Sequence, residues 1–368
     1  MMLVFVLLAG VFLFLASKIY ERTWVNGLEA GISFSRDKVY AGDTIRLTEE
    51  IVNRKKFPVQ EMEAGFRIPR GICFTGAENV VVSDYVYKRD IFSLRPMEAV
   101  RRSYQMTCMK RGRYQVDRIT LRAWSFFHRK KYEISVPCGK ELLVCPGSID
   151  ISGIRHHCDV LMGSDRSRRT LFEDPFAFNG IREYQPADPV NRINWRATAR
   201  TQNLMVNTYA SVRSEQYMIF LDVADERIIK EEKEVEAGIK AAASLCRRLI
   251  RDGQAAGMAV NSEPPVFFEP QRGTQHLANI EYFLTGELKG RRTADLDGLM
   301  SDFSVYCKKN RQSDQTGVMI RILISKNPDA AELIREAALS GDSRPGAFVL
   351  VAPYLDGGEE KLSVRTIT

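Results

Sequence analysis

The chain opens on an uninterrupted apolar run. Residues 1–17 read MMLVFVLLAGVFLFLAS and hold no charged side chain. This length is close to the ~17–20 residues that a helix needs to cross the hydrocarbon core of a bilayer. Lys18 and Arg22 follow the run and no basic residue precedes it, which by the positive-inside rule places the C-terminal side in the cytoplasm. The pattern predicts a retained transmembrane helix over residues 1–20 of a single-pass cell-membrane protein, with a cleaved signal peptide as the alternative.

Short alternating patterns of apolar and polar residues dominate residues 30–146. Residues 44–48 (TIRLT) and 119–124 (ITLRAW) alternate as half-buried strands do. Turn sequences separate such runs, for example AGD at 41–43 and RGR at 111–113. Many short strands at this spacing predict an all-β domain, an immunoglobulin-like β-sandwich.

From residue 213 to 368, patterns of buried strands alternate with helical patterns. Residues 217–222 (YMIFLD) are a continuous apolar run of the buried-strand type, and residues 233–251 repeat apolar side chains on one helical face. Further strands are predicted at residues 258–260, 319–325 and 347–352, with a helix at 332–339. This alternation predicts an α/β domain with a doubly wound, parallel, Rossmann-type sheet.

Residues 147–174 separate the two patterned regions. The stretch 163–170 is polar, has no apolar periodicity and carries three arginines, which are Arg166, Arg168 and Arg169. It reads as a flexible linker, with a basic contact loop as the alternative.

Residues 175–212 hold the most unusual stretch of the chain, which reads GIREYQPADPVNRINWRATAR at 180–200. Asp188 followed by Pro189 is a good helix start, because Asp is a favoured N-cap and Pro is favoured at the first helical position. The pattern therefore predicts a helix from residue 189 to about residue 200.

Three arginines share one side of this predicted helix. Arg192, Arg196 and Arg200 are spaced four apart and therefore line one stripe. Trp195 lies beside that stripe, and we expect its large ring to be mostly buried.

Composition places the chain among folded proteins of two domains plus a short appendage. It has 368 residues, of which 45% are hydrophobic and 27% charged. The net charge of +7 permits nucleic-acid binding without indicating it, and it equally suits a protein beside an anionic membrane. A nucleic-acid binder would need stacking aromatics among its basic residues, so we expect no nucleic-acid partner.

The cysteines and histidines suggest no metal site. The seven cysteines are odd in number and show no short zinc or redox spacing, which predicts reduced thiols and a cytoplasmic folded part. The run His156-His157-Cys158 has no second cluster that would complete a tetrahedral site, so we interpret it as a plain loop.

The signature at 180–200 resembles that of the domain of unknown function 58 family. The residues that carry the resemblance are Gly180, Arg182, Glu183, Tyr184, Asp188, Arg192, Ile193, Trp195, Ala199 and Arg200. RGRY at 111–114 and LVCP at 143–146 resemble the family's late-sandwich turn and its strand into the linker. WSFF at 124–127 departs from the family's Asp-Pro-Phe-Gly turn.

The resemblance implies a von Willebrand A-like C-terminal domain. It also implies association with MoxR-type AAA ATPases and transglutaminase-like membrane proteins, no established enzymatic activity, and a role in assembling or maturing other complexes. We therefore expect a non-enzymatic, membrane-anchored adaptor or scaffold without a cofactor. An enzyme whose site combines signature and α/β-domain residues, and a nucleic-acid binder, are the alternatives.

A von Willebrand A-like domain raises the question of a magnesium site. Such a site follows the first strand as Asp-x-Ser-x-Ser, because Mg²⁺ prefers oxygen ligands. Here Asp222 is in place, but Ala224 and Glu226 replace the two serines. We expect a degenerate, metal-free strand end. A preserved site, or a rearranged one that uses Asp222 with Asp225 or Glu226, are the alternatives.

The signature residues have two main interpretations. In the structural one, the arginines Arg182, Arg192, Arg196 and Arg200 pair with Glu173, Asp174, Glu183 and Asp188. In the other, they form an exposed site for an acidic protein surface. We expect Arg182 and Arg192 to be buried and Arg196 to be the exposed contact, with Tyr184 beside them as a further candidate.

Overall fold

The computed structural model describes residues 2–75, 80–82, 85–124, 131–154, 156–158, 178–186, 188–209, 215–224, 232–288, 292–309, 318–327, 330, 348–356 and 359–367. The chain divides into two compact units. The first combines Met1–Ser148 with Glu281–Gly290, and the second combines Ile149–Ile280 with Arg291–Thr368. The first unit is therefore not continuous in sequence.

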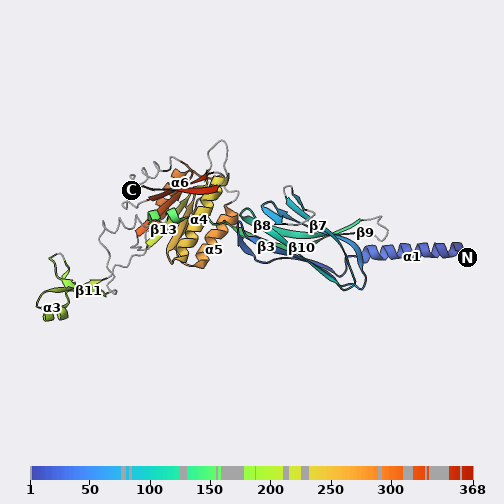
Figure 1. Ribbon diagram of the computed structural model, residues 1–368, viewed down its shortest axis with the longest axis horizontal. Helices are drawn as coiled ribbons and strands as arrows, with labels where there is room; N and C mark the ends of the chain where they lie inside the picture. The colour runs from blue at the N-terminus through green and yellow to red at the C-terminus, as the bar shows by residue number, and fades with distance from the viewer. Residues whose placement is uncertain are drawn as a thin grey trace. The chain divides into compact units, whose positions relative to one another are not determined.

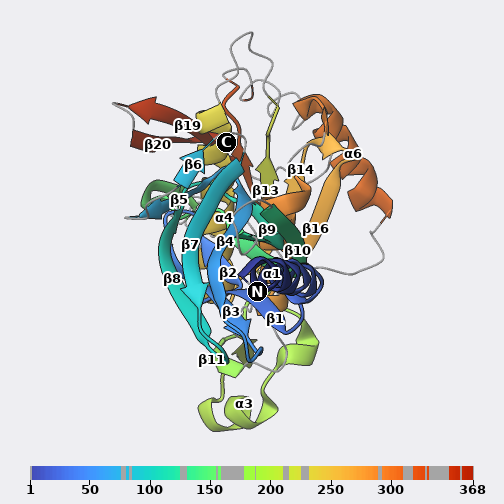
Figure 2. The ribbon, with the colours of Figure 1, turned by 90° about the vertical axis from the view of Figure 1, so that its right-hand side faces the viewer.

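The N-terminal apolar run forms helix α1, Met2–Thr23 (Figures 1 and 2). Across the described residues, no helix is both long and apolar enough to cross a membrane. The uncharged part of α1 ends at Ser17, and at 1.5 Å per residue it spans about 24 Å of the ~30 Å hydrocarbon core. Lys18 and Glu21 pair at 3.2 Å beyond it. The predicted transmembrane anchor, and the single-pass membrane location with it, are wrong.

The end of α1 belongs to the packing of the first unit. Large side chains in its earlier turns are exposed, among them Phe5 at 74% and Phe12 at 69%. By contrast, Tyr20 and the following Trp24 pack onto the sandwich, where both rings contact Tyr132. The last turn of the helix is therefore fixed to the β-domain.

Two sheets make up the sandwich of the first unit (Figure 1). The four-stranded sheet has the order β1 (Leu28–Phe34), β3 (Thr44–Asn53), β8 (Ala99–Cys108), β5 (Ile72–Thr75). The six-stranded sheet has the order β2 (Lys38–Tyr40), β10 (Lys131–Cys145), β9 (Gly112–Trp124), β4 (Val59–Pro69), β7 (Tyr85–Leu94), β6 (Val80–Val82). All neighbours are antiparallel except β2 and β10. Inward residues such as Leu47, Met62 and Leu121 form the core.

A segment from the second half of the sequence completes this unit. It holds the last residues of α5 (Thr274–Tyr282) and the π-helix η2 (Phe283–Glu287). Glu281 is buried and pairs with Lys38 at 2.6 Å. Arg111 donates to the carbonyl oxygen of Leu284. These contacts hold the segment beside the turn that leads into β9.

The turn at residues 110–114, which leads into β9, packs against Gly71, which lies between β4 and β5. Gly71 has a φ of +121°, and a side chain there would collide with the hydroxyl of Tyr114. That hydroxyl donates to the carbonyl oxygen of Lys110 at 2.7 Å. The glycine therefore lets the buried tyrosine close the 110–114 turn.

The second unit is built on a six-stranded mixed sheet. Its order is β16 (Val266–Gln271), β14 (Ala255–Val260), β13 (Glu215–Leu221), β18 (Val318–Ile324), β19 (Phe348–Asp356), β20 (Glu359–Ile367). The four central strands are parallel, whereas β16 and β20 are antiparallel to their neighbours. The short connections before β16 and β20 explain this, since a parallel crossover needs a dozen residues or more. The expected uniformly parallel sheet is therefore wrong.

Helices lie on both faces of this sheet. A side chain added at Gly238 of α4 (Glu232–Arg251) would contact Leu221 and Ile324 on one face. Phe303 of α6 (Leu296–Lys309) packs against Phe220 on the other. A two-residue ribbon, β15 (Ser262–Glu263) with β17 (Arg292–Thr293), accompanies them. The described residues are nonetheless mostly β-sheet with few helices, which also corrects the expected balance of the fold class.

Candidate functional site

The signature segment is built on a two-stranded antiparallel ribbon of β11 (Phe178–Glu183) and β12 (Met205–Tyr209). Arg182 of β11 forms a bidentate pair with Asp188, with Nη1–Oδ2 at 2.7 Å and Nη2–Oδ1 at 2.6 Å. The backbone N–H of Gln185 also donates to Asp188 at 2.9 Å. The Arg182 guanidinium, followed by this backbone bond, holds the pKa of Asp188 below its usual value. Asp188 therefore closes a turn and does not cap a helix.

The signature helix is shorter than predicted. Helix α3 spans Trp195–Thr201, and its N-cap is Asn194, whose side chain accepts from the backbone N–H of Ala197 at 3.0 Å. Pro189 is extended, and the 3-10 turn η1 (Val190–Arg192) separates it from α3. Arg192 thus lies outside α3, so the predicted single stripe of three arginines is wrong. Only Arg196 and Arg200 share a helix.

Trp195 is exposed, contrary to expectation. It exposes 66% of its surface, and no residue of α3 is buried. The inward side of α3 is polar instead, because the hydroxyl of Thr198 accepts from the backbone N–H of Met205 at 3.0 Å. Arg182 is also 43% exposed, so its expected burial is wrong.

The remaining signature candidates divide between the described and undescribed parts of the chain. Tyr184 is half-buried, and its backbone N–H donates to Leu204 at 2.8 Å. Arg192 is partly buried. The proposed partners Glu173 and Asp174 lie outside the described residues, as does the basic stretch 163–170.

At the end of β13, the oxygens of Asp222 accept hydrogen bonds from three directions. Oδ1 accepts from Asn261 Nδ2 at 2.6 Å and from the backbone N–H of Ala224 at 3.0 Å. Oδ2 accepts from the hydroxyl of Ser325 at 2.6 Å. Asp222 is 8% exposed, and Asn261 and Ser325 are buried beside it. Asp225 lies outside the described residues.

This arrangement provides donors where a cation would need acceptors. An amide, a hydroxyl and a backbone N–H already satisfy the carboxylate, so Mg²⁺ would have to displace them. Within the described ranges, no three His, Cys, Asp or Glu residues are grouped to hold a metal. Sequence reasoning missed Asn261 and Ser325. Their positions in the sequence could have identified them, since each directly follows a buried strand whose carboxyl end meets that of β13.

The cysteines described are free thiols, which are Cys73, Cys108, Cys138, Cys145, Cys158 and Cys246. Burial raises the pKa of Cys108 to about 11. The run at 156–158 is helical and not a loop; there Cys158 is buried while His156 is exposed, so these side chains do not converge.

Comparison with known proteins identifies the signature and the sheet that follows it. Residues 180–345 match the model of the family described as "Protein of unknown function DUF58". This part of the chain belongs to the DUF58 family. A similar curated protein is the "Uncharacterized protein YeaD" of Bacillus subtilis (strain 168), 21% identical over 259 residues. The alignment covers 70% of this chain and 61% of that protein, so the chain spans less than two thirds of its relative.

Two solved structures each resemble part of the chain. A CARDB domain from Pyrococcus furiosus matches with a TM-score of 0.19 and 18% identity, covering 30% of this chain and 93% of that one. A non-cellulosomal cohesin from Archaeoglobus fulgidus matches with a TM-score of 0.22 and 11% identity, covering 35% and 97%. Similarities this low give no functional information.

Charged side chains also lie between the two sheets of the sandwich, where sequence reasoning missed them. Glu49 and Tyr104 point inward from the four-stranded sheet, and Lys88 and Asp90 from the six-stranded sheet. The Tyr104 hydroxyl lies 3.2 Å from Glu49 Oε2 and donates to Asp90. Asp90 also accepts from Lys88 at 2.9 Å and pairs with Arg102 at 3.4 Å. We call these five residues the inner cluster.

The pKa values of the two acids of the inner cluster are shifted in opposite directions. Burial raises the pKa of Glu49, and the hydrogen bond with Tyr104 opposes it only partly. Burial would also raise the pKa of Asp90, but hydrogen bonds from Lys88 and Tyr104 outweigh burial and lower it. A signal was available, because Glu49 occupies an inward position in the alternation of Leu47 and Ile51.

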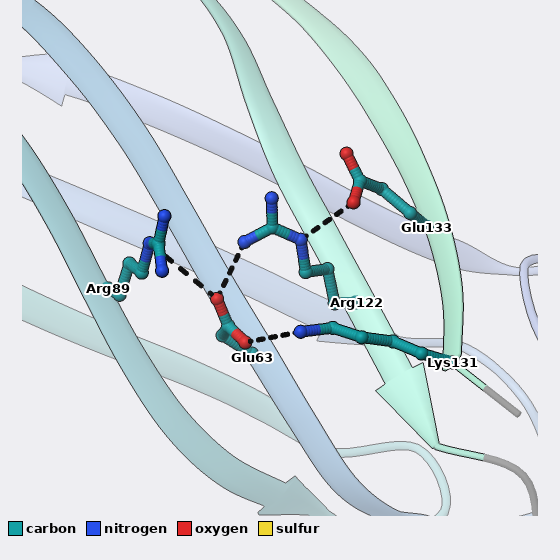
Figure 3. A network of polar contacts seen from close by, with 5 residues as sticks. All are labelled: Glu63, Arg89, Arg122, Lys131 and Glu133. Atoms are coloured by element: carbon teal, nitrogen blue, oxygen red, sulfur yellow. Dashed lines mark hydrogen bonds and ion pairs between the residues drawn. The ribbon is translucent and has the colours of Figure 1, made fainter. Parts of the chain in front are cut away.

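On the outer face of the six-stranded sheet, Glu63 of β4 forms ion pairs with three cationic side chains (Figure 3). Arg122 of β9 donates to Glu63 at 2.7 Å, Lys131 of β10 at 3.3 Å, and Arg89 of β7 lies 3.8 Å away. Arg122 also donates to Glu133 at 2.7 Å. This outer network connects the exposed surfaces of four neighbouring strands.

Proposed function

We propose that this DUF58 member is a non-enzymatic adaptor that binds an acidic surface of a partner protein through α3. The observation that carries the proposal is the exposure of Trp195, 66% of its surface, on the same helix as the exposed Arg196 and Arg200. Trp and Arg are the side chains that most often dominate the binding energy of protein interfaces.

The charge of α3 favours an acidic partner. Arg196 and Arg200 are four residues apart and therefore lie on one side of the helix. Within the described part of the chain, neither guanidinium has an ion-pair partner. Arg182, in contrast, is neutralised by Asp188. A partner with carboxylates around an apolar depression would complement the two free cations and the indole.

The partner that we propose is a MoxR-type AAA ATPase, the class that the family resemblance implies. In this proposal the adaptor presents the ATPase to another protein complex during its assembly or maturation. A non-enzymatic role is consistent with Asp222, whose oxygens are engaged by Asn261, Ser325 and Ala224.

The test is capture of the cognate ATPase by the full chain. Trp195→Ala and the double variant Arg196→Glu with Arg200→Glu should each weaken binding at least ~10-fold, as loss of an interface hot spot does. The control is Arg46→Glu, which reverses an exposed charge on β3. Wild-type affinity in both α3 variants would refute the proposal, and so would an equal loss in the control.

A further inference from the structure

The Tyr104 hydroxyl lies between two carboxylates and has one proton to donate. Its oxygen is within hydrogen-bonding distance of Glu49 Oε2, at 3.2 Å, and of Asp90 Oδ2. A carboxylate is only an acceptor. If both acids were ionised, one of these two contacts would therefore place two oxygens together without a proton between them. One additional proton makes both contacts hydrogen bonds.

The surroundings decide which acid holds this proton. Asp90 faces two cations, with Lys88 Nζ at 2.9 Å and Arg102 Nη1 at 3.4 Å. Glu49 is 1% exposed, and its Oε1 is buried with no hydrogen-bond partner among the described residues. A carboxylate with an unsatisfied oxygen in the interior is far costlier than a neutral acid in the same place. The geometry therefore places the proton on Glu49.

The surroundings of the cluster suit a proton rather than a metal ion. A metal ion beside the acids would lie close to the two existing cations, Lys88 and Arg102, and would need space for several oxygen ligands. A proton needs only the oxygen that already lies 3.2 Å from Tyr104.

We propose that Glu49 is a proton-binding site that is occupied at neutral pH, and that its proton completes a chain of hydrogen bonds from Glu49 through Tyr104 to Asp90. The bonds run from Glu49 Oε2–H to Tyr104 Oη, and from Tyr104 Oη–H to Asp90 Oδ2. Glu49 and Tyr104 belong to the four-stranded sheet and Asp90 to the six-stranded sheet. Removing the proton breaks the first bond and leaves a buried carboxylate with an unsatisfied oxygen, so alkaline pH destabilises the sandwich where β3, β8 and β7 meet.

The groups that face Glu49 are Lys88 and Asp90 from β7 and Arg102 and Tyr104 from β8. Burial raises the pKa of Glu49, whereas the pKa of Asp90 is lowered because its hydrogen bonds from Lys88 and Tyr104 outweigh burial. Burial, followed by the adjacent Asp90, raises the pKa of Tyr104, so its hydroxyl keeps its proton. These directions agree with the placement of the proton. The proposal does not depend on α3 or on a partner.

Infrared spectroscopy of the full chain at neutral pH tests the proposal directly. The difference between wild type and Glu49→Gln should contain the carbonyl band of a protonated carboxylic acid, which a carboxylate lacks. In Tyr104→Phe the band should persist and shift, because the acid has lost its hydrogen-bond acceptor. A difference spectrum that contains only carboxylate bands would overturn the proposal.

Unfolding equilibria provide a second measurement. Because the pKa of Glu49 is raised on folding, the wild type should lose stability relative to Glu49→Gln as pH rises from the ordinary carboxyl value of 4.5. One proton changes the folding equilibrium constant tenfold per pH unit, and this slope should continue through neutrality. The control is Glu50→Gln, the adjacent outward acid on β3, which pairs with Arg101 at 2.9 Å and should leave the profile unchanged. Parallel profiles for wild type and Glu49→Gln would contradict the proposal.

Discussion

Glu49 lies on the inner face of the four-stranded sheet, and Glu63 lies on the outer face of the six-stranded sheet. The pKa values of their carboxyl groups are shifted in opposite directions. Glu49 points inward and has one hydroxyl near it, and burial raises its pKa. Glu63 points outward, and although burial again acts to raise its pKa, the bonds from Arg122 and Lys131 outweigh burial and lower it. The side chain of Glu63 is only 12% exposed. The partners of a carboxylate therefore decide its charge as much as burial does.

The largest effect should come from removing a cation inside the sandwich. Lys88→Met leaves Asp90 without its buried ammonium partner, and we expect a loss of about 3–5 kcal/mol in the free energy of unfolding. Denaturant melting measures it. The matched control is Lys131→Met on the outer face, where Lys131 is 40% exposed and the loss should stay below ~1 kcal/mol. Equal losses of stability in Lys88→Met and Lys131→Met would show that a cation inside the sandwich contributes no more than one on its outer face.

The second effect concerns the hydroxyl that the two inner acids share. Tyr104→Phe keeps the ring that contacts Phe66 and Phe74 and removes only the hydrogen-bonding group. We expect a loss of about 1–3 kcal/mol, because buried oxygens of Glu49 and Asp90 lose a partner. Thermal and denaturant melting should agree on this value. An unchanged free energy of unfolding in Tyr104→Phe would show that the hydroxyl does not hold the sheets together.

A smaller effect is expected at the centre of the outer network. Arg122→Met removes the bonds to both Glu63 and Glu133 but leaves Lys131 and Arg89 beside Glu63. We expect a loss of about 1–2 kcal/mol, between the value of an exposed ion pair and that of a charged hydrogen bond. The melts should be compared at low and high salt, because screening should reduce this loss more than the loss in Lys88→Met.

The smallest effect should appear in the acid range. The pKa of Glu63 is lowered on folding, so its ionised form contributes stability above the ordinary carboxyl value of 4.5 that is lost as pH falls through the lowered value. Glu63→Gln should therefore lose less stability than wild type on acidification, by under ~1 kcal/mol. A pH series of urea melts checks this. A larger acid loss in the variant would reverse the assigned direction.

Local patterns predicted some elements of the protein well and others poorly, for identifiable reasons. The apolar periodicity of residues 233–251 predicts a helix that the structure contains as α4, since a long amphipathic face has few alternatives. In the signature, both Asp188 and Asn194 are acceptable N-caps. The bidentate pair of Asp188 with Arg182 selects Asn194, and this choice depends on a contact six residues away.

The candidate sites show the same limit. Alternation along β3 could have placed Glu49 inward, beside Leu47 and Ile51, although sequence reasoning missed it. It could not provide Asp90 or Tyr104, which come from other strands brought together by the packing of two sheets. Likewise, Asp222 was identifiable as a strand end, whereas its partners Asn261 and Ser325 come from residues 39 and 103 positions away.

The discontinuity of the first unit has a consequence for its synthesis. The ribosome makes Met1–Ser148 first, and the 132 residues of Ile149–Ile280 must follow before Glu281–Gly290 appears. At about 5–20 residues per second this takes roughly 7–26 s. During that interval Lys38 and Arg111 lack the acceptors that Glu281 and Leu284 later provide. The sandwich of a nascent chain is therefore incomplete until Glu281–Gly290 has been synthesised, and a fragment that ends at Ser148 lacks this segment.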